Sequence, residues 1–235
     1  MINSIIEDLK LVSERERASV LSRFFKTGKG EYGEGDLFVG ITVPNARKIA
    51  KKYSKGIDYN NLQELLSSEI HEYRLTALLI IVDKYSKDKD EANRKTLIDF
   101  YLSNTRYINN WDLVDLSCYK CLGEWLLDRD KDILLTLANS DNLWEQRISI
   151  VTCMHFIRNE QYDTFLQIAE KLLYHKHDLI HKAIGWLLRE TGKKNIEIEK
   201  AFLKKHYKKM PRTMLRYSIE RFPKEERQKY LKGEI

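Results

Sequence analysis

Two residues suited to binding a charged group, Trp111 and Asp115, lie four positions apart in the stretch NNWDLVDLS, residues 109–117. Side chains four residues apart share one face of a helix, so a helical conformation would set the indole beside the carboxylate. A second acid, Asp112, is expected in the first turn, where the helix dipole favours a negative charge. Trp111 and Asp115 are therefore candidates for a binding site. The alternative is a helix start beside a core tryptophan.

Trp186 has a comparable setting among basic residues. Lys182 precedes it by four positions and Arg189 follows it by three, in the stretch HKAIGWLLRE. All three side chains would share one helix face, which suits a charged ligand. Trp125 and Trp144, by contrast, occupy contexts that are more typical of a core.

The cysteines and histidines indicate no metal site. Cys118 and Cys121 have the spacing of half a zinc site, but no second pair exists and Cys153 is distant. On a helix, Cys118 and Cys121 are expected to fill apolar space. The six histidines form no evident triad, and neither a serine-nucleophile elbow nor a phosphate loop is present. No metal and no cofactor are expected.

The segment Lys26–Gly40 holds five of the ten glycines and predicts an ordered loop or short hairpin between helices. Gly28, Gly30 and Gly33 match G-x-G-x-x-G, but a dinucleotide site needs a preceding strand, and a helix is expected there. The loop either approaches a DNA backbone through its lysines or forms a rigid surface turn.

The rest of the sequence predicts helices that repeat in pairs. Only 3 prolines and 10 glycines occur in 235 residues, and apolar residues recur at intervals of three and four, which favours an all-α fold. The expected helices cover residues 72–85, 92–103, 145–157, 160–174, 181–190, 196–208 and 213–222. Cap signals precede several of them, including Asn142, Asp178 and Pro211.

A shared register supports this repeat. Arg74, Trp111, Arg147, Lys182 and Arg216 follow one another at intervals of 37, 36, 35 and 34 residues. This period predicts a single α-solenoid of HEAT-like two-helix repeats over residues 1–235, a curved superhelix whose concave face carries the basic residues. Such a row could follow a phosphate backbone. The alternative is that each arginine pairs with an acid of the adjacent repeat.

Positive charge is concentrated near the C-terminus. Residues 193–235 contain 14 Lys/Arg and 6 Asp/Glu, whereas the remaining 192 residues contain 27 and 29, so the formal net charge of +6 arises entirely from the C-terminal fifth. This asymmetry indicates a polyanionic partner such as nucleic acid, to which Lys193 and Lys194 would contribute. A solvated lysine-rich helix surface is the alternative.

No apolar run approaches the roughly 20 residues that span a bilayer, so no membrane association is expected. The start of the chain, MINSIIEDLK, lacks the features of a signal peptide. Together with an odd number of cysteines, this favours a cytoplasmic protein.

Four separated stretches resemble the bacterial AlkD-type DNA alkylation-repair proteins. They are KTGKGEYGEGDLFVGITVPNARK, NNWDLVDLS, DNLWEQRIS and IHKAIGWLLRE, in the order of that family, and the resemblance runs from about Phe24 to Phe222. One departure is the glycine-rich insert, which is absent from some members. The family consists of HEAT-like DNA glycosylases that remove N3- and N7-alkylated purines, such as 3-methyladenine and 7-methylguanine.

The resemblance implies specific roles for residues of this chain. Asp115, Trp111 and Trp186 match the aspartate and two tryptophans that line the cleft beside the lesion's deoxyribose, and Arg147 matches a DNA-contacting arginine. It also implies a nucleoid-associated monomer that acts on duplex DNA with alkylated bases. The duplex would be held on the concave face, and the base would not be flipped into a pocket, unlike in most glycosylases.

These residue types suit the chemistry of such a reaction. Alkylation at N3 or N7 makes the purine cationic, so it leaves as a neutral base, and the difficult species is the oxocarbenium ion of the sugar. A carboxylate stabilises that charge and orients water, while indole faces attract a cation. No lysine amine is required, which implies a monofunctional hydrolase. Two alternatives remain: a non-catalytic binder of damaged or branched DNA, and a protein–protein scaffold.

Overall fold

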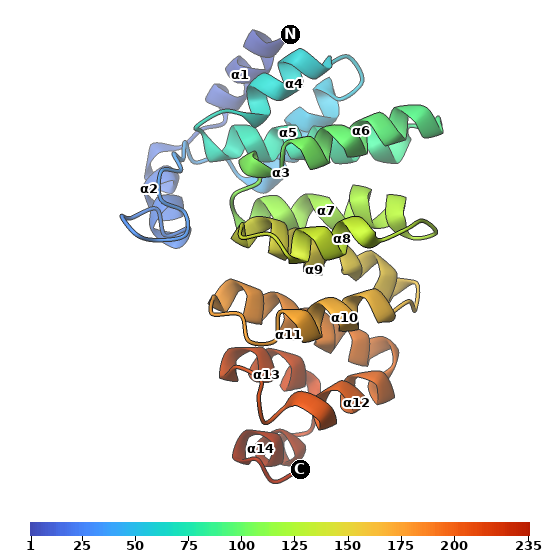
Figure 1. Cartoon of the computed structure of the whole chain (residues 1–235). Coiled ribbons are helices and arrows are strands. Elements are labelled where there is room, and N and C mark those ends of the chain that lie inside the picture. The colour runs from blue at the N-terminus through green and yellow to red at the C-terminus, as the bar shows by residue number, and fades with distance from the viewer. The chain divides into compact units, whose positions relative to one another are not determined.

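The computed structural model describes all 235 residues and consists of α-helices joined by turns and one longer loop (Figure 1). A parallel bridge between Leu37 and Ile70 is the only β-type pairing. The all-α prediction is thus confirmed. No helix is long and apolar enough to cross a membrane. The α-helices are α1 (Ile2–Leu11), α2 (Arg15–Phe24), α3 (Val43–Tyr53), α4 (Tyr59–Leu66), α5 (His71–Lys87), α6 (Glu91–Ser103), α7 (Trp111–Leu126), α8 (Asp132–Ala138), α9 (Leu143–Arg158), α10 (Asp163–Lys171), α11 (Asp178–Lys194), α12 (Ile196–His206), α13 (Arg212–Ser218) and α14 (Lys224–Lys232).

The chain forms two compact units, Met1–Cys121 and Leu122–Ile235, with the boundary inside α7. The expectation of one domain over residues 1–235 stays a prediction, as do the curved superhelix and its basic concave face.

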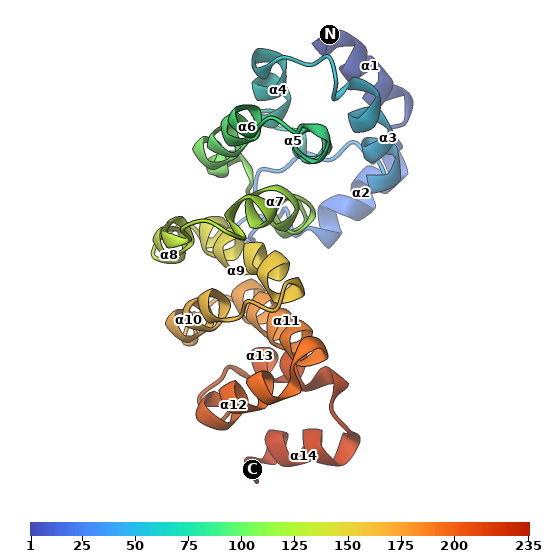
Figure 2. The ribbon, with the colours of Figure 1, turned by 90° about the vertical axis from the view of Figure 1, so that its right-hand side faces the viewer.

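The second unit contains the predicted two-helix repeats. Helix α11 packs between α9 and α13, and the helices α8, α10 and α12 each contact a member of this row. Figure 2 shows α8, α10 and α12 along one side of the unit, with α9, α11 and α13 beside them. Helices α9, α11 and α13 therefore form the packed row of this unit, as expected for stacked helix pairs.

The helix starts correct the register proposed from the sequence. Helices α7, α9, α11 and α13 begin at residues 111, 143, 178 and 212. The fifth residue of each is Asp115, Arg147, Lys182 and Arg216, so Asp115, not Trp111, occupies the position of the basic residues. The predicted register was wrong at this position because it aligned single residues at nearly equal intervals of 34–37 positions. The segments that join the helices differ in length, so the helix starts are not equally spaced.

Most helix boundaries match the prediction to within a few residues. Helix α10 is shorter than the expected 160–174, because Glu160 adopts a positive φ of 61° and separates it from α9. The expected helix over 213–222 divides into α13 and a short 3₁₀ turn, Ile219–Arg221.

The predicted caps are partly correct. Asn142 caps α9, since its side-chain oxygen accepts a hydrogen bond from the Trp144 amide at 2.8 Å. Asp178 is instead the first residue of α11, and the ring of His177 accepts the capping bond from the Leu179 amide. A histidine ring nitrogen can take the place of the usual capping oxygen, which is why the prediction misplaced this cap by one residue.

Helix α5 is the centre of the first unit. It packs against α3, α4 and α6, and its residues from His71 to Ile81 are all buried. Burial of each Leu or Ile contributes about 1.5–3 kcal/mol relative to exposure. Because polar groups are included in this buried stretch, His71, Glu72 and Arg74 require partners inside the protein.

The glycine-rich segment supplies some of those partners. It forms an ordered loop between α2 and α3, as predicted, and its end is held against the start of α5. The Glu72 carboxylate accepts hydrogen bonds from the backbone amides of Val39, Gly40 and Ile41. In addition, the His71 amide donates to the Leu37 carbonyl at 2.8 Å. The buried carboxylate is thus satisfied by backbone donors, and the loop is fixed on α5.

Gly40→Ala is expected to lower the free energy of unfolding by about 2–3 kcal/mol. Gly40 has a positive φ of 83°, and a Cβ there would overlap the Glu14 carbonyl oxygen, so strain and overpacking combine. Gly30→Ala is a matched control, since Gly30 has a φ of 78° but a Cβ at that position would meet no atom within 4 Å. Urea unfolding should show a clearly smaller loss for the control; equal losses would contradict the close packing of Gly40 on α2.

Candidate functional site

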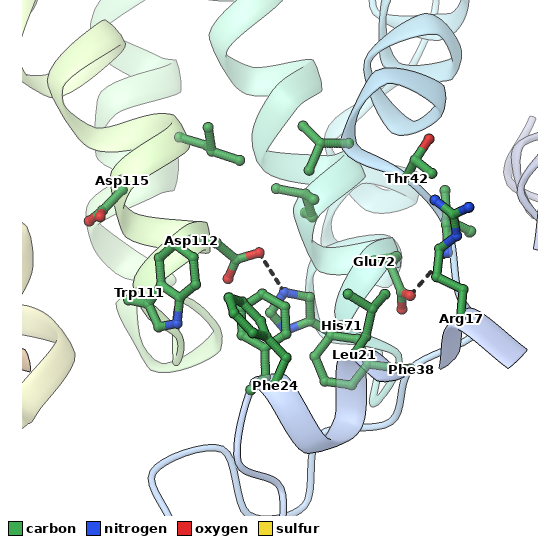
Figure 3. Close-up of a pocket in the computed structure, with 15 residues that line it drawn as sticks. Arg17, Leu21, Phe24, Phe38, Thr42, His71, Glu72, Trp111, Asp112 and Asp115 are labelled. Atoms are coloured by element: carbon green, nitrogen blue, oxygen red, sulfur yellow. Dashed lines mark hydrogen bonds and ion pairs between the residues drawn. The ribbon is translucent and has the colours of Figure 1, made fainter. Parts of the chain in front are cut away.

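A pocket of about 380 Å³ in the first unit brings together the α2–α3 loop, α2, α5 and the start of α7 (Figure 3). Trp111 and Asp115 both line it, as do Asp112, His71 and Glu72. The predicted juxtaposition of Trp111 and Asp115 on one helix is therefore present. The sequence did not indicate that α2 and the loop complete the pocket.

Aromatic side chains form much of the pocket wall. The Phe25 ring stacks on Trp111 with centroids 5.3 Å apart, and it also stacks on Phe38 at 5.0 Å. Phe24 meets the edge of Trp111 at 6.0 Å and is 61% exposed. Such pairs contribute about 0.5–1.5 kcal/mol each beyond the area they bury. The indole of Trp111 is consequently held in place from one side by phenylalanines.

Asp112 and Asp115 of α7 have different surroundings. Asp112 is buried in the first turn, as predicted, and its carboxylate lies 2.9 Å from Nε2 of His71. Asp115 is half-buried, one turn farther along α7, and Figure 3 shows it on the side of the helix away from His71. Asp112 therefore forms an internal ion pair with His71, whereas Asp115 lies on another side of α7.

His71 connects the loop to α7. Its Nδ1 lies 3.0 Å from Asp36 and its Nε2 lies 2.9 Å from Asp112. Burial lowers the pKa of His71, but the carboxylates of Asp112 and Asp36 outweigh burial and raise that pKa from 6.5 to about 9. At neutral pH the ring is thus an imidazolium that donates to both acids.

Asp36 joins this cluster to the turn before α7. Burial raises the pKa of Asp36, but hydrogen bonding to His71 and the charge of Arg74 outweigh it and lower that pKa. Its carboxylate also accepts hydrogen bonds from the side-chain amides of Asn109 and Asn110, at 3.2 and 3.3 Å. The Asn110 side chain in turn accepts from the Trp111 amide at 2.8 Å. The ionic cluster therefore fixes the backbone that carries Trp111.

Arg74 belongs to this cluster and is almost fully buried. It is 4% exposed and its guanidinium donates to Asp36 at 2.6 Å and to the Ser68 carbonyl. Burial and pairing with Asp36 argue against a DNA contact by Arg74 and match the alternative, pairing with an acid. Burial of the start of α5, which the register does not encode, is the reason.

The other candidate residues lie in the second unit, and their exposure differs. Trp186 is half-buried on α11, next to Gly185, where a Cβ would collide with the backbone of Met214 on α13. Arg147 is 5% exposed and donates to the Leu179 carbonyl. Arg147 is thus held inside the unit, whereas Lys194 and Arg216 are exposed.

Three further cations of the second unit form ion pairs at its surface. Lys182 pairs with Asp178 and Lys193 with Glu190, each at 2.6 Å. Arg189 pairs with Glu220 of the segment after α13. Exposed pairs of this kind are worth about 0–1 kcal/mol, so a phosphate could replace their acidic partners at little cost.

The cysteines have the structural role expected for them. Cys118 and Cys121 on α7 and Cys153 on α9 are all fully buried free thiols. Burial raises the pKa of the Cys153 thiol well above its ordinary value, which disfavours the reactive thiolate.

Sequence reasoning missed the acids, rings and imidazole that surround Trp111. Asp36, Phe38 and His71 are separated from Trp111 by 75, 73 and 40 positions. The one local signal was the polar pair His71–Glu72 at the head of the apolar run of α5. Such a pair predicts buried partners, but not which ones.

Comparisons with known proteins identify the family. The family model described as "DNA alkylation repair enzyme" matches residues 5–222. No curated protein is significantly similar in sequence. Among solved structures, a predicted DNA alkylation repair enzyme from Enterococcus faecalis is similar with a TM-score of 0.68 at 18% identity, over 90% of this chain and 97% of that one. That structure supports the fold, and the family model covers most of the sequence; the chain therefore belongs to the DNA alkylation repair enzyme family.

Proposed function

We propose that this protein is a monofunctional DNA glycosylase that hydrolyses the N-glycosidic bond of cationic N3- and N7-alkylated purines in duplex DNA. The observation that carries the proposal is the placement of Asp115 beside Trp111 at one pocket, on a helix whose start is fixed by the His71 cluster. Family membership supports a role in alkylation repair. No cofactor or metal is part of the proposed reaction.

The bond between C1′ and the purine nitrogen breaks first in this mechanism. Its electron pair neutralises the cationic base, which leaves without a strong general acid. Positive charge then develops on the deoxyribose as an oxocarbenium ion. Asp115 would stabilise this charge through its carboxylate, and the indole faces of Trp111 and Trp186 would add about 0.5–2 kcal/mol each. Water then bonds to C1′, and Asp115 orients it and accepts its proton.

The aromatic wall supports the assignment of Trp111. An indole that approaches a sugar cation must keep its face in place, and Phe25 stacks on one face of Trp111. Since the base is not flipped in the proposed mechanism, the lability and charge of the alkylated base would select the substrate. A preference between 3-methyladenine and 7-methylguanine is accordingly not built into this proposal.

DNA binding is assigned to basic residues of α9, α11 and α13. Lys194 and Arg216 are exposed, and Lys182, Arg189 and Lys193 have surface acids as ionic partners. Release of counterions by these side chains would supply non-specific affinity. Arg147 would first have to leave the Leu179 carbonyl, so its contribution is expected to depend on side-chain movement.

Incubation with methylated duplex DNA tests the proposal. Free 7-methylguanine and 3-methyladenine are measured by chromatography against heat-inactivated protein, and release should exceed the spontaneous rate by several orders of magnitude. Retained DNA binding without release would favour the alternative, a non-catalytic binder of damaged or branched DNA. Absence of both would favour the scaffold.

A further inference from the structure

A second hollow, of about 480 Å³, lies at the C-terminal end of the second unit. It is lined by five lysines from α12 and the turn after it, with Tyr207, Tyr230 and Ile235. The lysines are Lys200, Lys204, Lys205, Lys208 and Lys209, named here the α12 lysine cluster. No aspartate or glutamate side chain lines the hollow. The cluster therefore accounts for much of the positive charge that the sequence places in this region.

Only part of this charge is compensated within the protein. Lys205 pairs with Glu170 at 2.7 Å and Lys200 with Glu226 at 3.2 Å. Lys204, Lys208 and Lys209 are exposed and form no ion pair. Lys200 and Lys204 are four residues apart on α12, and like charges at this spacing disfavour a helix. An anionic ligand would offset this repulsion.

The α12 lysine cluster is separate from the residues assigned to the repair reaction in this unit. Lys182, Trp186 and Arg216 belong to α11 and α13, in the row formed with α9. Helix α12 lies with α8 and α10 along the other side of the unit (Figure 2). A ligand on the cluster would therefore occupy another side of the second unit.

The chemistry of the hollow favours an extended polyanion. Lysines one helical turn apart repeat at about 6 Å along the axis, which presents several ammonium groups in a row. Lysine makes a flexible point-charge contact that suits a phosphate backbone without reading its sequence. Tyr207 and Tyr230 are 5% and 4% exposed, so the hollow lacks the accessible aromatic anchors typical of a protein–protein hot spot.

We propose that the α12 lysine cluster binds the backbone of a second DNA segment, in addition to the segment acted on at the repair site. This inference extends the proposed function by giving the protein two DNA-contacting surfaces. It needs duplex DNA but no alkylated base, so it can be tested on undamaged DNA.

The test uses the full chain with Lys204→Gln, Lys208→Gln and Lys209→Gln combined. The control combines Lys51→Gln, Lys55→Gln and Lys89→Gln, three exposed lysines of the first unit, and loses the same charge. Affinity for an undamaged duplex is measured at several salt concentrations. Each lost phosphate contact should reduce the slope of log K against log salt by about 0.9, so the cluster variant should lose about 2.7. The slope for the control variant should fall by less than about 0.9, the value for one phosphate contact.

A bridging experiment separates a second segment from a longer footprint on the same one. Wild-type protein should retain a labelled short duplex on an immobilised duplex, and the cluster variant should lose this retention while the control keeps it. Single-turnover base release at saturating protein should be unchanged in the cluster variant. An unaltered salt slope, or bridging that survives the substitutions, would overturn the proposal. Failure of wild-type protein to release bases would overturn the glycosylase assignment alone.

Discussion

Asp115→Asn is expected to slow the release of 7-methylguanine from methylated duplex DNA by about 10²–10³-fold, the loss typical for removal of one electrostatic stabiliser of a transition state. The amide keeps the shape of the side chain but cannot neutralise the charge that develops on the sugar. It also cannot accept a proton from the attacking water. Binding to DNA should change little, because the carboxylate contributes repulsion, not attraction, toward phosphates.

Single-turnover release at saturating protein measures this effect apart from affinity. Asp99→Asn is the control, since Asp99 is an exposed acid of α6 paired with Lys95 at 2.6 Å. Its loss should leave release within a factor of two. Asp112→Asn provides a second comparison: it should act mainly on stability through His71. If Asp112→Asn abolished release and Asp115→Asn did not, Asp112 and Asp115 would have to exchange their assigned roles.

Much of the fold could be predicted because helical periodicity is local. The apolar intervals of three and four in residues 145–157 and 181–190 correspond to α9 and α11, whose buried faces they form. The side-chain pairing of Trp111 with Asp115 follows from the same periodicity. Periodicity does not determine the exact start of each helix. For this reason the predicted register assigns to Trp111 the position that Asp115 occupies in the structure.

Local sequence patterns could not predict the residues that hold the candidate site in place. Asp36 meets His71 and Arg74 across 35 and 38 positions, through a loop whose course depends on tertiary contacts. The spacing of Arg74 matches that of exposed cations and so predicts DNA binding, but spacing carries no information about burial. Because the start of α5 is buried, the guanidinium of Arg74 forms an internal ion pair with Asp36. A polar residue in an apolar helix therefore indicates an internal partner at least as strongly as an external one.

His71 is expected to make the stability of the protein depend on pH in the alkaline range. Its pKa is raised from 6.5 to about 9 on folding, so its contribution is fully present below about pH 6.5. The contribution is lost as pH rises through about 9, and it amounts to about 3 kcal/mol for a shift of this size. The physical cause is that a neutral ring can donate to only one of Asp36 and Asp112, which leaves the other carboxylate facing a lone pair.

Urea unfolding of wild type and His71→Gln between pH 6 and 10 measures this contribution as a difference. The difference is needed because burial also raises the pKa of Glu199 to about 8, and that group lowers stability as pH rises toward 8 in both proteins. At pH 6, His71→Gln should lower the free energy of unfolding by about 3–5 kcal/mol, as for a broken buried ion pair. This gap between wild type and variant should narrow by about 3 kcal/mol at pH 10. His206→Gln, which removes an imidazole of α12 that pairs with Glu170 of α10, should retain the wild-type pH profile above pH 8. A gap that stays constant with pH would mean that His71 is not an imidazolium in the folded protein, and the start of α7 would then be held by neutral hydrogen bonds alone.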